Sequence, residues 1–402
     1  MEQWKEYRLG EIGKIITGKT PRTAIKGNYG GTIPFLTPSD DMACKFVSHT
    51  NKTLTPLGLA EVKNCLLPEN SICVSCIGSD LGKVVKTQEP SVTNQQINSI
   101  IPYKAFDADF VYYLMCIVGK DLNFISKTST AVPIVNKSTF SNYKVRIPQI
   151  GVQKAIGNIL SSLDDKIELN RKINSNLEEQ AKALFKSWFI DFEPFKGGKF
   201  VDSELGMIPE GWKVGTLSEV ADITMGASPN GKSYNKNGDG AVFYQGRAEF
   251  GFRFPHRSLF TSEPKKFAET NSTLLSVRAP VGDINMANEK CCIGRGLASI
   301  KSRKGYNSFI FYLLASQKAK FNCYNSEGTV FGCINKQDLE NFKVVIPNQM
   351  VINKFQEIVC PIDELIKAHE YEAHRVSLLR DTLLPKLMSG EIDVEQSKLL
   401  FI

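Results

Sequence analysis

The sequence predicts an α+β fold in which two similar, tandem globular domains are separated by two long helices. We expect these helices to pair as an antiparallel coiled coil about a pseudo-two-fold axis. Two observations predict this fold: the sequence is repeated at an offset of about 200 residues, and each copy ends in a helical segment with heptad-like spacing. A duplication this long predicts two domains, because solenoid repeats are far shorter and more numerous. With 402 residues, 42% of them hydrophobic, the chain can bury more than one core.

The repeat is clearest at the two ends of each copy, and it sets the expected domains. The matched pairs include Trp4 with Trp212, Leu9 with Leu217, Gly18 with Gly226 and Pro21 with Pro229 at an offset of 208 residues, and Asn136 with Asn335 and Pro148 with Pro347 at an offset of 199. We therefore expect a first globular domain over 1–148, a central helix over 149–192, a linker and second globular domain over 193–347, a distal helix over 348–391 and a tail over 392–402.

Each globular domain is expected to mix strands and helices. Short β-rich runs at 71–77 and 273–277 alternate with Gly, Asn and Pro turns. Helical stretches are expected at 108–118 and 308–319. A linker over 193–211, which contains Gly and Pro, joins the central helix to the second domain.

Apolar residues in the two helical segments recur at alternating steps of four and three, the 3.5-residue period of a left-handed coiled coil. The first seam comprises Ile156, Leu160, Leu163, Ile167, Asn170, Asn174, Leu177, Ala181, Leu184 and Trp188, and the second comprises Phe355, Val359, Ile362, Ile366, His369, Ala373, Val376, Arg380, Leu383 and Leu387, with Leu379 as a substitute for Arg380. Pro148 and Pro347 precede the helices as start signals. We expect Pro385 to loosen the last turn of the second helix and Gly390 to end it.

The middle of each seam is polar, which costs stability but fixes the register of the helices. An antiparallel pairing about the midpoints places Asn174 against His369, and Asn170 against Ala373. We favour this pairing because a two-fold axis between equivalent domains requires it. The alternative is that these polar residues face solvent or a partner subunit.

Composition narrows the class of protein. The sequence has no run of 18 apolar residues and no apolar signal-peptide centre near its start, so we expect a soluble, cytoplasmic protein without a membrane partner. The ten cysteines stand in apolar surroundings and are expected to be reduced core thiols. The net charge of +7 arises in the globular domains and not in the helical segments. Mild basicity fits a nucleic-acid surface as well as ordinary solubility.

No catalytic or metal site is evident, so the chain is expected to be non-catalytic. Cys73-x-x-Cys76 has no second pair, and alternation along a strand turns the two thiols to opposite faces. His369 and His374 are five residues apart, whereas a zinc-protease helix needs a spacing of four. The sequence also lacks a Walker loop, a Gly-x-Ser-x-Gly elbow and the Asn- or Asp-Pro-Pro-aromatic tetrapeptide of adenine methyltransferases.

Repeated polar loops are the best candidates for function. Three pairs of loops share a frame but differ in side chains: 17–22 with 225–230, 37–39 with 245–247, and 94–96 with 294–296. Glycine lets backbone amides approach an anion, hydroxyls and cations contact phosphates, and Gln or Asn suits adenine where Arg suits guanine. The candidate nucleic-acid contacts are Lys19, Arg22, Lys26, Ser39, Gln95, Gln96, Lys137, Lys232, Arg247, Arg253, Arg295 and Lys336. Ordinary surface loops that drifted after duplication are the alternative.

Five segments carry a resemblance to a known family. They are Trp4-Lys5 with Leu9-Gly10-Glu11-Ile12 and Thr17-Gly18; Ile147-Pro148 with Leu163-Asp164-Asp165-Lys166-Ile167-Glu168-Leu169-Asn170; Leu184-Phe185-Lys186-Ser187-Trp188-Phe189-Ile190-Asp191-Phe192; Gly206-x-Ile208-Pro209-x-Gly211-Trp212; and Leu383-Leu384-Pro385-Lys386-Leu387-Met388-Ser389-Gly390-Glu391-Ile392. Through them the chain resembles, over essentially its whole length, the specificity (S) subunit of type I restriction-modification systems. His369 and Arg380 interrupt the second seam, which leaves the helix pairing open.

The resemblance implies two target-recognition domains, each of which recognises one half of a split double-stranded DNA target. It also implies two modification subunits, which are adenine methyltransferases that bind S-adenosylmethionine, and restriction subunits that use ATP and Mg for translocation and cleavage. No cofactor or metal is expected in this chain. The helices are expected to set the spacing and to dock partners, through Leu163, Ile167, Asn170, Asn174, Leu177, Leu184, Trp188, Ile362, Ile366, His369, Val376 and Leu383.

Two other classes of protein remain open at the level of the sequence. One is a duplicated protein–protein scaffold that never contacts DNA, and the other is an unfamiliar nuclease or methyltransferase. The missing motifs disfavour an enzyme. Charge reversal at Lys19, Arg22 and Arg247 tests the scaffold alternative, because the binding of a scaffold that never contacts DNA would not change.

Overall fold

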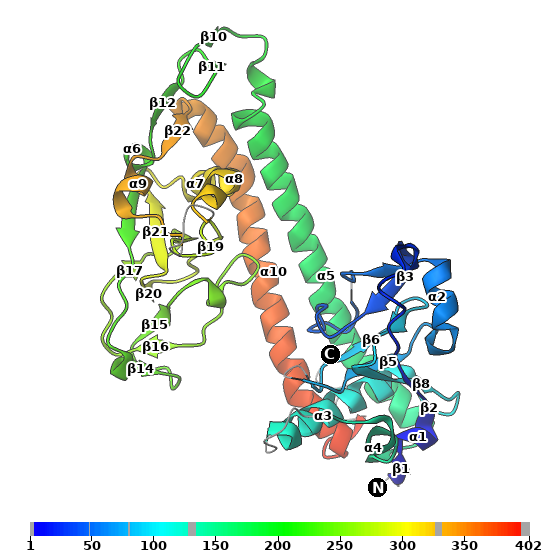
Figure 1. Ribbon diagram of the computed structural model, residues 1–402. Coiled ribbons are helices and arrows are strands. Elements are labelled where there is room, and N and C mark those ends of the chain that lie inside the picture. Colours follow the sequence, from blue (N-terminus) through cyan, green and yellow to red (C-terminus); the bar gives the residue numbers. More distant parts are fainter. Residues whose placement is uncertain (1–3, 48, 79–80, 128–133, 326–331, 395–402) are drawn as a thin grey trace. The chain divides into compact units, whose positions relative to one another are not determined.

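A computed structural model of the protein describes residues 4–47, 49–78, 81–127, 134–325 and 332–394 (Figure 1). The chain divides into two compact units. Unit 1 comprises Met1–Leu169 and Ala373–Ile402, and unit 2 comprises Asn170–Glu372. Each unit therefore contains one globular domain together with half of each long helix. The part of the expected C-terminal tail over 395–402 lies outside the described residues.

The globular part of unit 1 is built from short strands and helices. In chain order these are β1 (Lys5–Arg8), α1 (Leu9–Ile12), β2 (Gly13–Thr17), η1 (Lys26–Asn28), β3 (Tyr29–Leu36), β4 (Thr53–Leu54), α2 (Pro56–Glu61), η2 (Lys63–Cys65), β5 (Ile72–Ser75), β6 (Val84–Lys86), β7 (Val92–Thr93), β8 (Ile97–Pro102), α3 (Ala108–Lys127), α4 (Lys137–Ser141) and β9 (Lys144–Ile147). An antiparallel sheet has the order β2-β8-β5-β6, and a second sheet has the order β4-β3-β7. In the second sheet β3 and β7 run parallel, and β1 pairs separately with β9.

The globular part of unit 2 repeats this plan. Its elements are η3 (Glu193–Phe195), β10 (Phe200–Val201), β11 (Ile208–Pro209), β12 (Lys213–Thr216), α6 (Leu217–Val220), β13 (Ala221–Met225), η4 (Gly231–Ser233), β14 (Tyr234–Asn235), β15 (Ala241–Tyr244), η5 (Arg247–Glu249), β16 (Phe260–Thr261), β17 (Phe267–Ala268), β18 (Thr273–Ser276), β19 (Ile284–Met286), β20 (Cys291–Ile293), β21 (Leu297–Ser302), α7 (Asn307–Ser316), α8 (Lys318–Cys323), α9 (Lys336–Glu340) and β22 (Lys343–Ile346). The sheet β13-β21-β18-β19 matches β2-β8-β5-β6, and the parallel pair β15–β20 matches β3–β7. The pair β12–β22 matches β1–β9, so the duplication seen in the sequence is confirmed in the topology.

Repeated residues in the sequence have repeated local roles. Asn136 and Asn335 are the N-caps of α4 and α9, where each side-chain oxygen accepts a backbone N–H at 2.9 Å. Leu9 and Leu217 begin α1 and α6 and are fully buried in the cores of their units. These pairs recur because the same caps and the same core contacts are built twice.

A helix covers the four-stranded sheet in each unit and closes the core (Figure 1). In unit 1, α3 packs against β5 and β6, and its Phe110 and Met115 are fully buried. In unit 2, α7 packs against β21, followed by the shorter α8. The helix predicted over 108–118 is shorter than α3, and the helix predicted over 308–319 is divided into α7 and α8.

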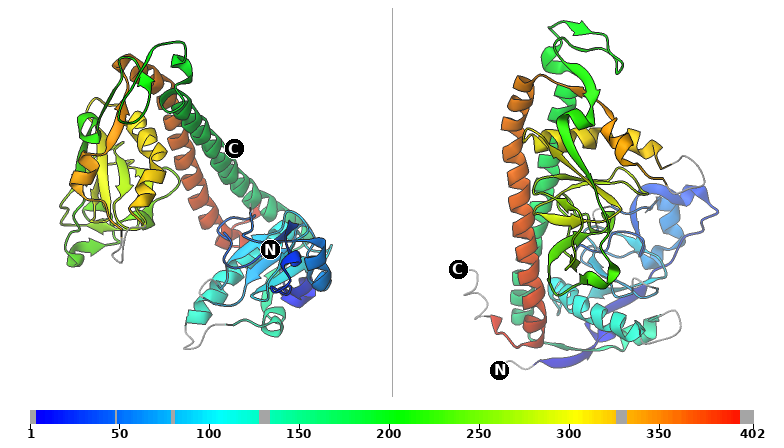
Figure 2. Two further views of the ribbon diagram at one scale, coloured as in Figure 1. Left: turned by 45° about the horizontal axis from the view of Figure 1, so that its top comes forward. Right: turned by 90° about the vertical axis from the view of Figure 1, so that its left-hand side faces the viewer.

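The two long helices, α5 (Ile150–Phe189) and α10 (Gln349–Ser389), run antiparallel, alongside each other within each unit (Figure 2). In unit 2, Phe185 packs on Phe355 near one end of the paired segment, and Asn174 meets Ile366 further along. In unit 1, Asp164 meets Arg380. The α+β fold class with two tandem domains and an antiparallel helix pair is thus confirmed.

The buried seam of the helices follows the predicted positions at first and then drifts. Ile156, Leu160, Leu163, Ile167 and Ala181 are buried as expected, but beyond Ala181 the buried residues are Phe185 and Phe189, while Leu184 and Trp188 are only half-buried. A nearly straight helix has 3.6 residues per turn and rotates by about 20° per heptad against a strict 3.5-residue pattern. After about four heptads, this rotation moves the buried stripe on by one residue.

In α10, Phe355, Val359, Ile366, Leu383 and Leu387 are buried, and Ile362, His369 and Val376 are half-buried. The expected substitution of Arg380 by Leu379 is wrong. Leu379 is exposed, while Arg380 occupies the seam and pairs with Asp164 at 2.6 Å. The helix is continuous through Pro385 to Ser389, and Gly390 ends it with a positive φ.

The polar middle of the seam is confirmed for the pair of Asn174 and His369. The Nδ1 of His369 lies 3.0 Å from the Oδ1 of Asn174, and the Asn174 amide donates to the Ile366 carbonyl at 3.0 Å. Asn170 donates to the carboxylate of Glu372 at 2.8 Å. Asn170 and Asn174 are both buried, so this layer is fixed by hydrogen bonds and not by solvent.

All ten cysteines are free thiols in the structure. Cys73 and Cys76 are buried, and burial raises their pKa values to about 12 and about 11. Cys323, Cys333 and Cys360 are exposed, so the expectation of core thiols is wrong for these three. Among the residues that the structure describes, no helix combines the length and apolarity needed to cross a membrane.

Candidate nucleic-acid interface

Three polar loops meet at one edge of the globular part of unit 1. They follow the ends of β2, β3 and β7, and the parallel pairing of β3 with β7 brings two of these ends together. Backbone hydrogen bonds join all three loops: Lys19 N–H donates to Thr93 O at 2.9 Å, and Asn94 N–H donates to Leu36 O at 3.1 Å. We call loops 18–22, 37–41 and 94–96 the first loop set.

Unit 2 builds the same junction with different residues. Ala227 N–H donates to Ile293 O at 2.9 Å, and Gly294 N–H donates to Tyr244 O at 2.8 Å. These are the repeat equivalents of the two bonds in unit 1. We call loops 226–230, 245–249 and 294–296 the second loop set. The loop pairs matched in the sequence are therefore brought together in space in both units.

Glycine at the start of each set is required for packing. A Cβ added at Gly18 would lie 2.2 Å from Asn94 O, and one added at Gly226 would lie 2.1 Å from Gly294 O. Their N–H groups donate to Ile97 O and Leu297 O. The expectation that these glycines present backbone amides to an anion is therefore corrected: the two amides bond to the first residues of β8 and β21.

Side chains of the first loop set are polar and bonded to one another. Gln95 is exposed, and its carbonyl accepts the Thr20 hydroxyl at 2.7 Å. The half-buried Gln96 accepts from the Asn94 amide at 2.9 Å. Lys19 is exposed at the same junction. With the exposed Arg22 of the same loop, this edge can offer amide groups, hydroxyls and two cations to a ligand.

The loop 37–41 is a fixed turn. The buried carboxylate of Asp40 accepts from the Thr37 backbone N–H at 2.7 Å and from the Asn51 N–H at 2.7 Å. The exposed Ser39 hydroxyl lies 2.7 Å from the Thr37 hydroxyl. Asp40 therefore shapes this loop from within, and Ser39 is at its surface.

The second loop set carries two guanidinium groups, those of Arg247 and Arg295. Arg295 is exposed, and its backbone N–H donates to the Ser228 hydroxyl at 3.2 Å, which ties the loops together. The half-exposed Arg247 forms an ion pair with Asp283. Lys318 also reaches Asp283, at 3.3 Å, so this carboxylate is shared by two cations.

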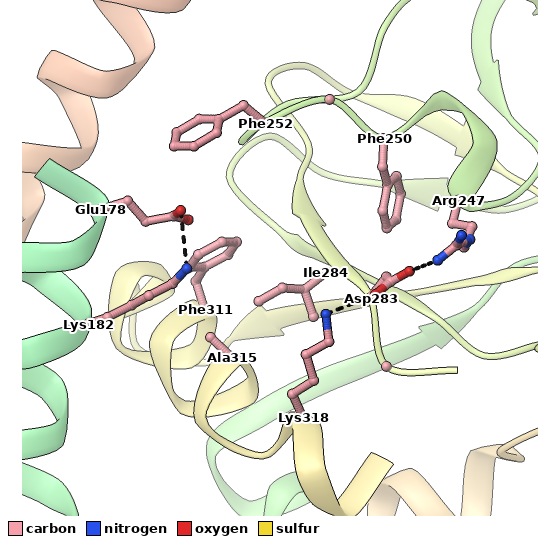
Figure 3. Close-up of a pocket in the computed structure, with 12 residues that line it drawn as sticks. Glu178, Lys182, Arg247, Phe250, Phe252, Asp283, Ile284, Phe311, Ala315 and Lys318 are labelled. Atoms are coloured by element: carbon pink, nitrogen blue, oxygen red, sulfur yellow. Dashed lines mark hydrogen bonds and ion pairs between the residues drawn. The ribbon is translucent and has the colours of Figure 1, made fainter. Parts of the chain in front are cut away.

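Arg247 stands at the wall of a cavity of about 430 Å³ (Figure 3). Figure 3 shows Arg247 and Lys318 directed at Asp283 on one side, and Lys182 directed at Glu178 of α5 on the other. Three phenylalanines, Phe250, Phe252 and Phe311, complete the lining together with Gly251, Gly282, Ile284 and Ala315. The wall carries three cations and two carboxylates, and each of the cations is paired with one of the carboxylates.

Three other predicted contacts are exposed cations in unit 1 and unit 2: Arg22, Lys26 and Lys232. Arg22 is exposed and meets Glu61, which accepts the Arg22 backbone N–H at 2.9 Å. This hydrogen bond is the main cause that lowers the pKa of Glu61, against a smaller opposing effect of burial. Lys26 and Lys232 are exposed in the short helices η1 and η4.

Lys137 and Lys336 are exposed at the first positions of α4 and α9. Lys336 forms an ion pair with Glu340, one helical turn on, at 3.2 Å. Both lysines therefore lie at the start of a short helix, directly after the repeated N-cap asparagine.

The expectation that Arg253 contacts nucleic acid is wrong. Its side chain is 1% exposed and bonds to Asp363, Tyr312 and Glu178 inside unit 2, so it cannot contact a ligand on the surface. Its repeat equivalent is Lys45, 208 residues earlier, which the sequence analysis missed. The signal was there in the sequence, because Lys45-Phe46 and Arg253-Phe254 follow the same offset as the first strands.

Within the part of the chain that the structure describes, no three His, Cys, Asp or Glu side chains are grouped so as to hold a metal ion. His369, one of the histidines considered, is engaged with Asn174 in the helix pair. The arrangement that repeats in both units is a polar edge built from three loops.

The comparisons with known proteins agree with this architecture. Residues 1–179 and 209–374 match the family described as type I restriction modification DNA specificity domain. The provisionally named MjaX specificity subunit of a type I restriction enzyme from Methanocaldococcus jannaschii is 36% identical over 412 residues, which cover 98% of this chain and 95% of the relative. The type I restriction enzyme MjaIX specificity subunit of the same organism is 29% identical over 419 residues, covering 98% and 95%.

A solved structure is similar in fold over nearly the whole chain. It is the type I restriction-modification system S subunit from M. genitalium, with a TM-score of 0.59 and 16% identity, covering 96% of each chain. Two tandem domains joined by long helices thus define the class of protein. The chain belongs to the family of type I restriction-modification specificity subunits.

Proposed function

We propose that this chain is the sequence-specific DNA-binding subunit of a type I restriction-modification complex, and that each loop set recognises one half of a bipartite target. One observation carries the proposal. The same three-loop junction is built twice by equivalent backbone hydrogen bonds, while the exposed side chains at its tips differ. A loop backbone that is repeated in both units, with different exposed side chains, suits two modules that recognise different sequences.

The tips have chemistry suited to base edges in the major groove. Gln95 and Gln96 in the first loop set present amides, which pair in a bidentate manner with adenine. Arg295 in the second presents a guanidinium, which pairs with guanine. Lys19 and the hydroxyl of Ser39 suit phosphate contacts, which position a protein on the duplex without specifying sequence.

The long helices are proposed to space the two modules and to dock the partner subunits. Helices of 40 and 41 residues are each about 60 Å long, more than one duplex turn of about 34 Å. The seam residues that are buried within the units hold the helices together, so the docking surface must include their outward faces. Methylation is assigned to two modification subunits that bind S-adenosylmethionine, and ATP- and Mg-dependent translocation and cleavage to restriction subunits.

Methylation mapping tests this proposal. The chain would be co-expressed with the modification subunits of its own locus, and host DNA would be sequenced by a method that detects modified adenine. We expect modified adenines within one split motif, present only when this chain is present. Unchanged methylation despite a stable complex would contradict the proposal and favour a protein–protein scaffold.

A further inference from the structure

Arg253 fastens a loop of the second domain to both long helices. Its guanidinium donates to Asp363 of α10 at 2.9 Å and lies 3.4 Å from Glu178 of α5. It also stacks over the ring of Phe311, 4.2 Å from the ring centroid, and donates to the Tyr312 hydroxyl at 2.9 Å. A buried cation is costly unless it is paired in this way, so these contacts hold the loop in one position.

The Glu370 side chain of α10 lies near the backbone of the same loop. Burial raises the pKa of the Glu370 carboxyl group, and the nearby backbone N–H groups of Arg253 and Phe254 oppose that shift without cancelling it. The carbonyl of Arg253 accepts the Met286 N–H at 2.9 Å, which joins the loop to β19.

Lys45 holds the corresponding loop of the first domain in a similar way. Its side chain is 8% exposed and its ammonium bonds to Ser161 of α5 at 2.7 Å and to Asp109 of α3 at 2.7 Å. The ammonium lies 5.3 Å from the ring centroid of Tyr113, the repeat equivalent of Tyr312. Its carbonyl accepts the Lys86 N–H at 2.7 Å, which matches the bond from Met286 in the second domain.

A Tyr–Asp bond beside each cation is also repeated. Tyr113 donates to Asp164 of α5 at 2.5 Å, and Tyr312 donates to Asp363 of α10 at 2.8 Å. Both pairs join the helix that covers the sheet to a long helix. The cation that meets the carboxylate differs: Arg380 of α10 reaches Asp164, whereas Arg253 itself reaches Asp363.

Each buried cation stands six residues after an exposed residue of a loop set. Ser39 precedes Lys45 and Arg247 precedes Arg253 by the same distance along the chain. The segment between them is therefore held at one end by the strand junction and at the other by the long helices. Phe311 and Glu178, which contact Arg253, also line the cavity that Arg247 borders (Figure 3).

We propose that Lys45 and Arg253 are equivalent positioning residues that do not touch DNA. Lys45 fastens a loop of the first DNA-recognition set to α5, and Arg253 fastens a loop of the second set to α5 and α10. The proposal rests on the proposed function. A loop held in advance loses less freedom on binding, and its contacts keep their geometry. Loss of either anchor should therefore relax recognition in one half of the target only.

Substitutions that keep the apolar stem but remove the charge test this role. In the full complex with its modification subunits, Arg253→Met should raise amide hydrogen exchange in 247–254 and lower discrimination in the second half-site about 10-fold, within the range of one bidentate base contact. Lys45→Met should do the same for the first domain and the first half-site. Arg253→Lys and Lys45→Arg, which keep the charge, should restore most of the discrimination.

Exposed lysines serve as matched controls. Lys265→Met in the second domain and Lys104→Met in the first remove a surface charge, and both should leave exchange and discrimination unchanged. Unchanged exchange in the anchored loops of the Met variants would overturn the proposal, as would equal loss in both half-sites. Raised exchange with full discrimination would also overturn it. A parent complex without any sequence preference would instead refute the proposed function, and with it the DNA part of this inference.

Discussion

Removal of the buried amide of Asn174 should destabilise the helix pair in unit 2. Asn174→Ala deletes the contact with His369 and the hydrogen bond to the Ile366 carbonyl, each 3.0 Å long. Each is worth about 0.5–1.5 kcal/mol, and a polar group left unpaired in a buried layer costs about 1–3 kcal/mol. We expect a loss of about 2–4 kcal/mol in the free energy of local opening. The higher helix propensity of alanine offsets only a small part of this loss.

Hydrogen exchange of the amides around 362–370 measures this free energy directly, because it reports local opening within one unit. The double variant Asn174→Leu with His369→Leu removes both partners and should recover most of the loss, since an apolar pair leaves nothing unsatisfied. Comparison of single and double variants gives the coupling between the two residues. A loss below about 0.5 kcal/mol in Asn174→Ala, or single-variant effects that simply add, would refute the role of this layer in the pairing.

Two further predictions concern packing and pH. Gly18→Ala places a Cβ against the Asn94 carbonyl and should weaken DNA binding at the first half-site, with a cost of about 1–3 kcal/mol from overpacking; Gly151→Ala, where the Cβ meets nothing within 4 Å, is the control and should be neutral or slightly stabilising in thermal unfolding. Burial opposes ionisation of Asp109, but hydrogen bonds from Lys45 and Lys86 outweigh it and hold its pKa below the usual value. The ionised carboxylate therefore stabilises the fold above the unfolded-state pKa of about 4, and this contribution is lost as pH falls through the lower folded-state pKa. In acid titrations of unfolding, Asp109→Asn should lose stability relative to the parent at neutral pH, and the difference should shrink below about pH 4; a constant difference would contradict this.

Internal repetition made most of the architecture predictable from the sequence. Residues that recur at a fixed offset must serve the same local purpose twice, as the caps Asn136 and Asn335 do. The heptad period predicted the seam of each long helix, and the two-fold relation of the repeated domains predicted the antiparallel pairing and the contact of Asn174 with His369. These features follow from short-range patterns that a single sequence displays.

Other features depend on how distant segments fold together. The shift of the buried seam to Phe185 arises from the accumulated twist of a real helix, which a heptad pattern does not record. A basic residue such as Arg253 was indistinguishable from a surface contact, because the acids that bury it come from α5 and α10. The repeat predicted which loops form the candidate interface, and the pairing of β3 with β7 brings two of these loops together. The sequence did not predict the contacts of the individual residues.

The central claim is that the two loop sets recognise different halves of one target. The most direct test compares Gln95→Ala with Arg295→Ala by methylation mapping of the full complex on a library of targets. We predict that each variant relaxes base preference in a different half, by about 1–3 kcal/mol at the affected position, and leaves the other half unchanged. Relaxation of the same half by both variants, or of neither half, would contradict the account.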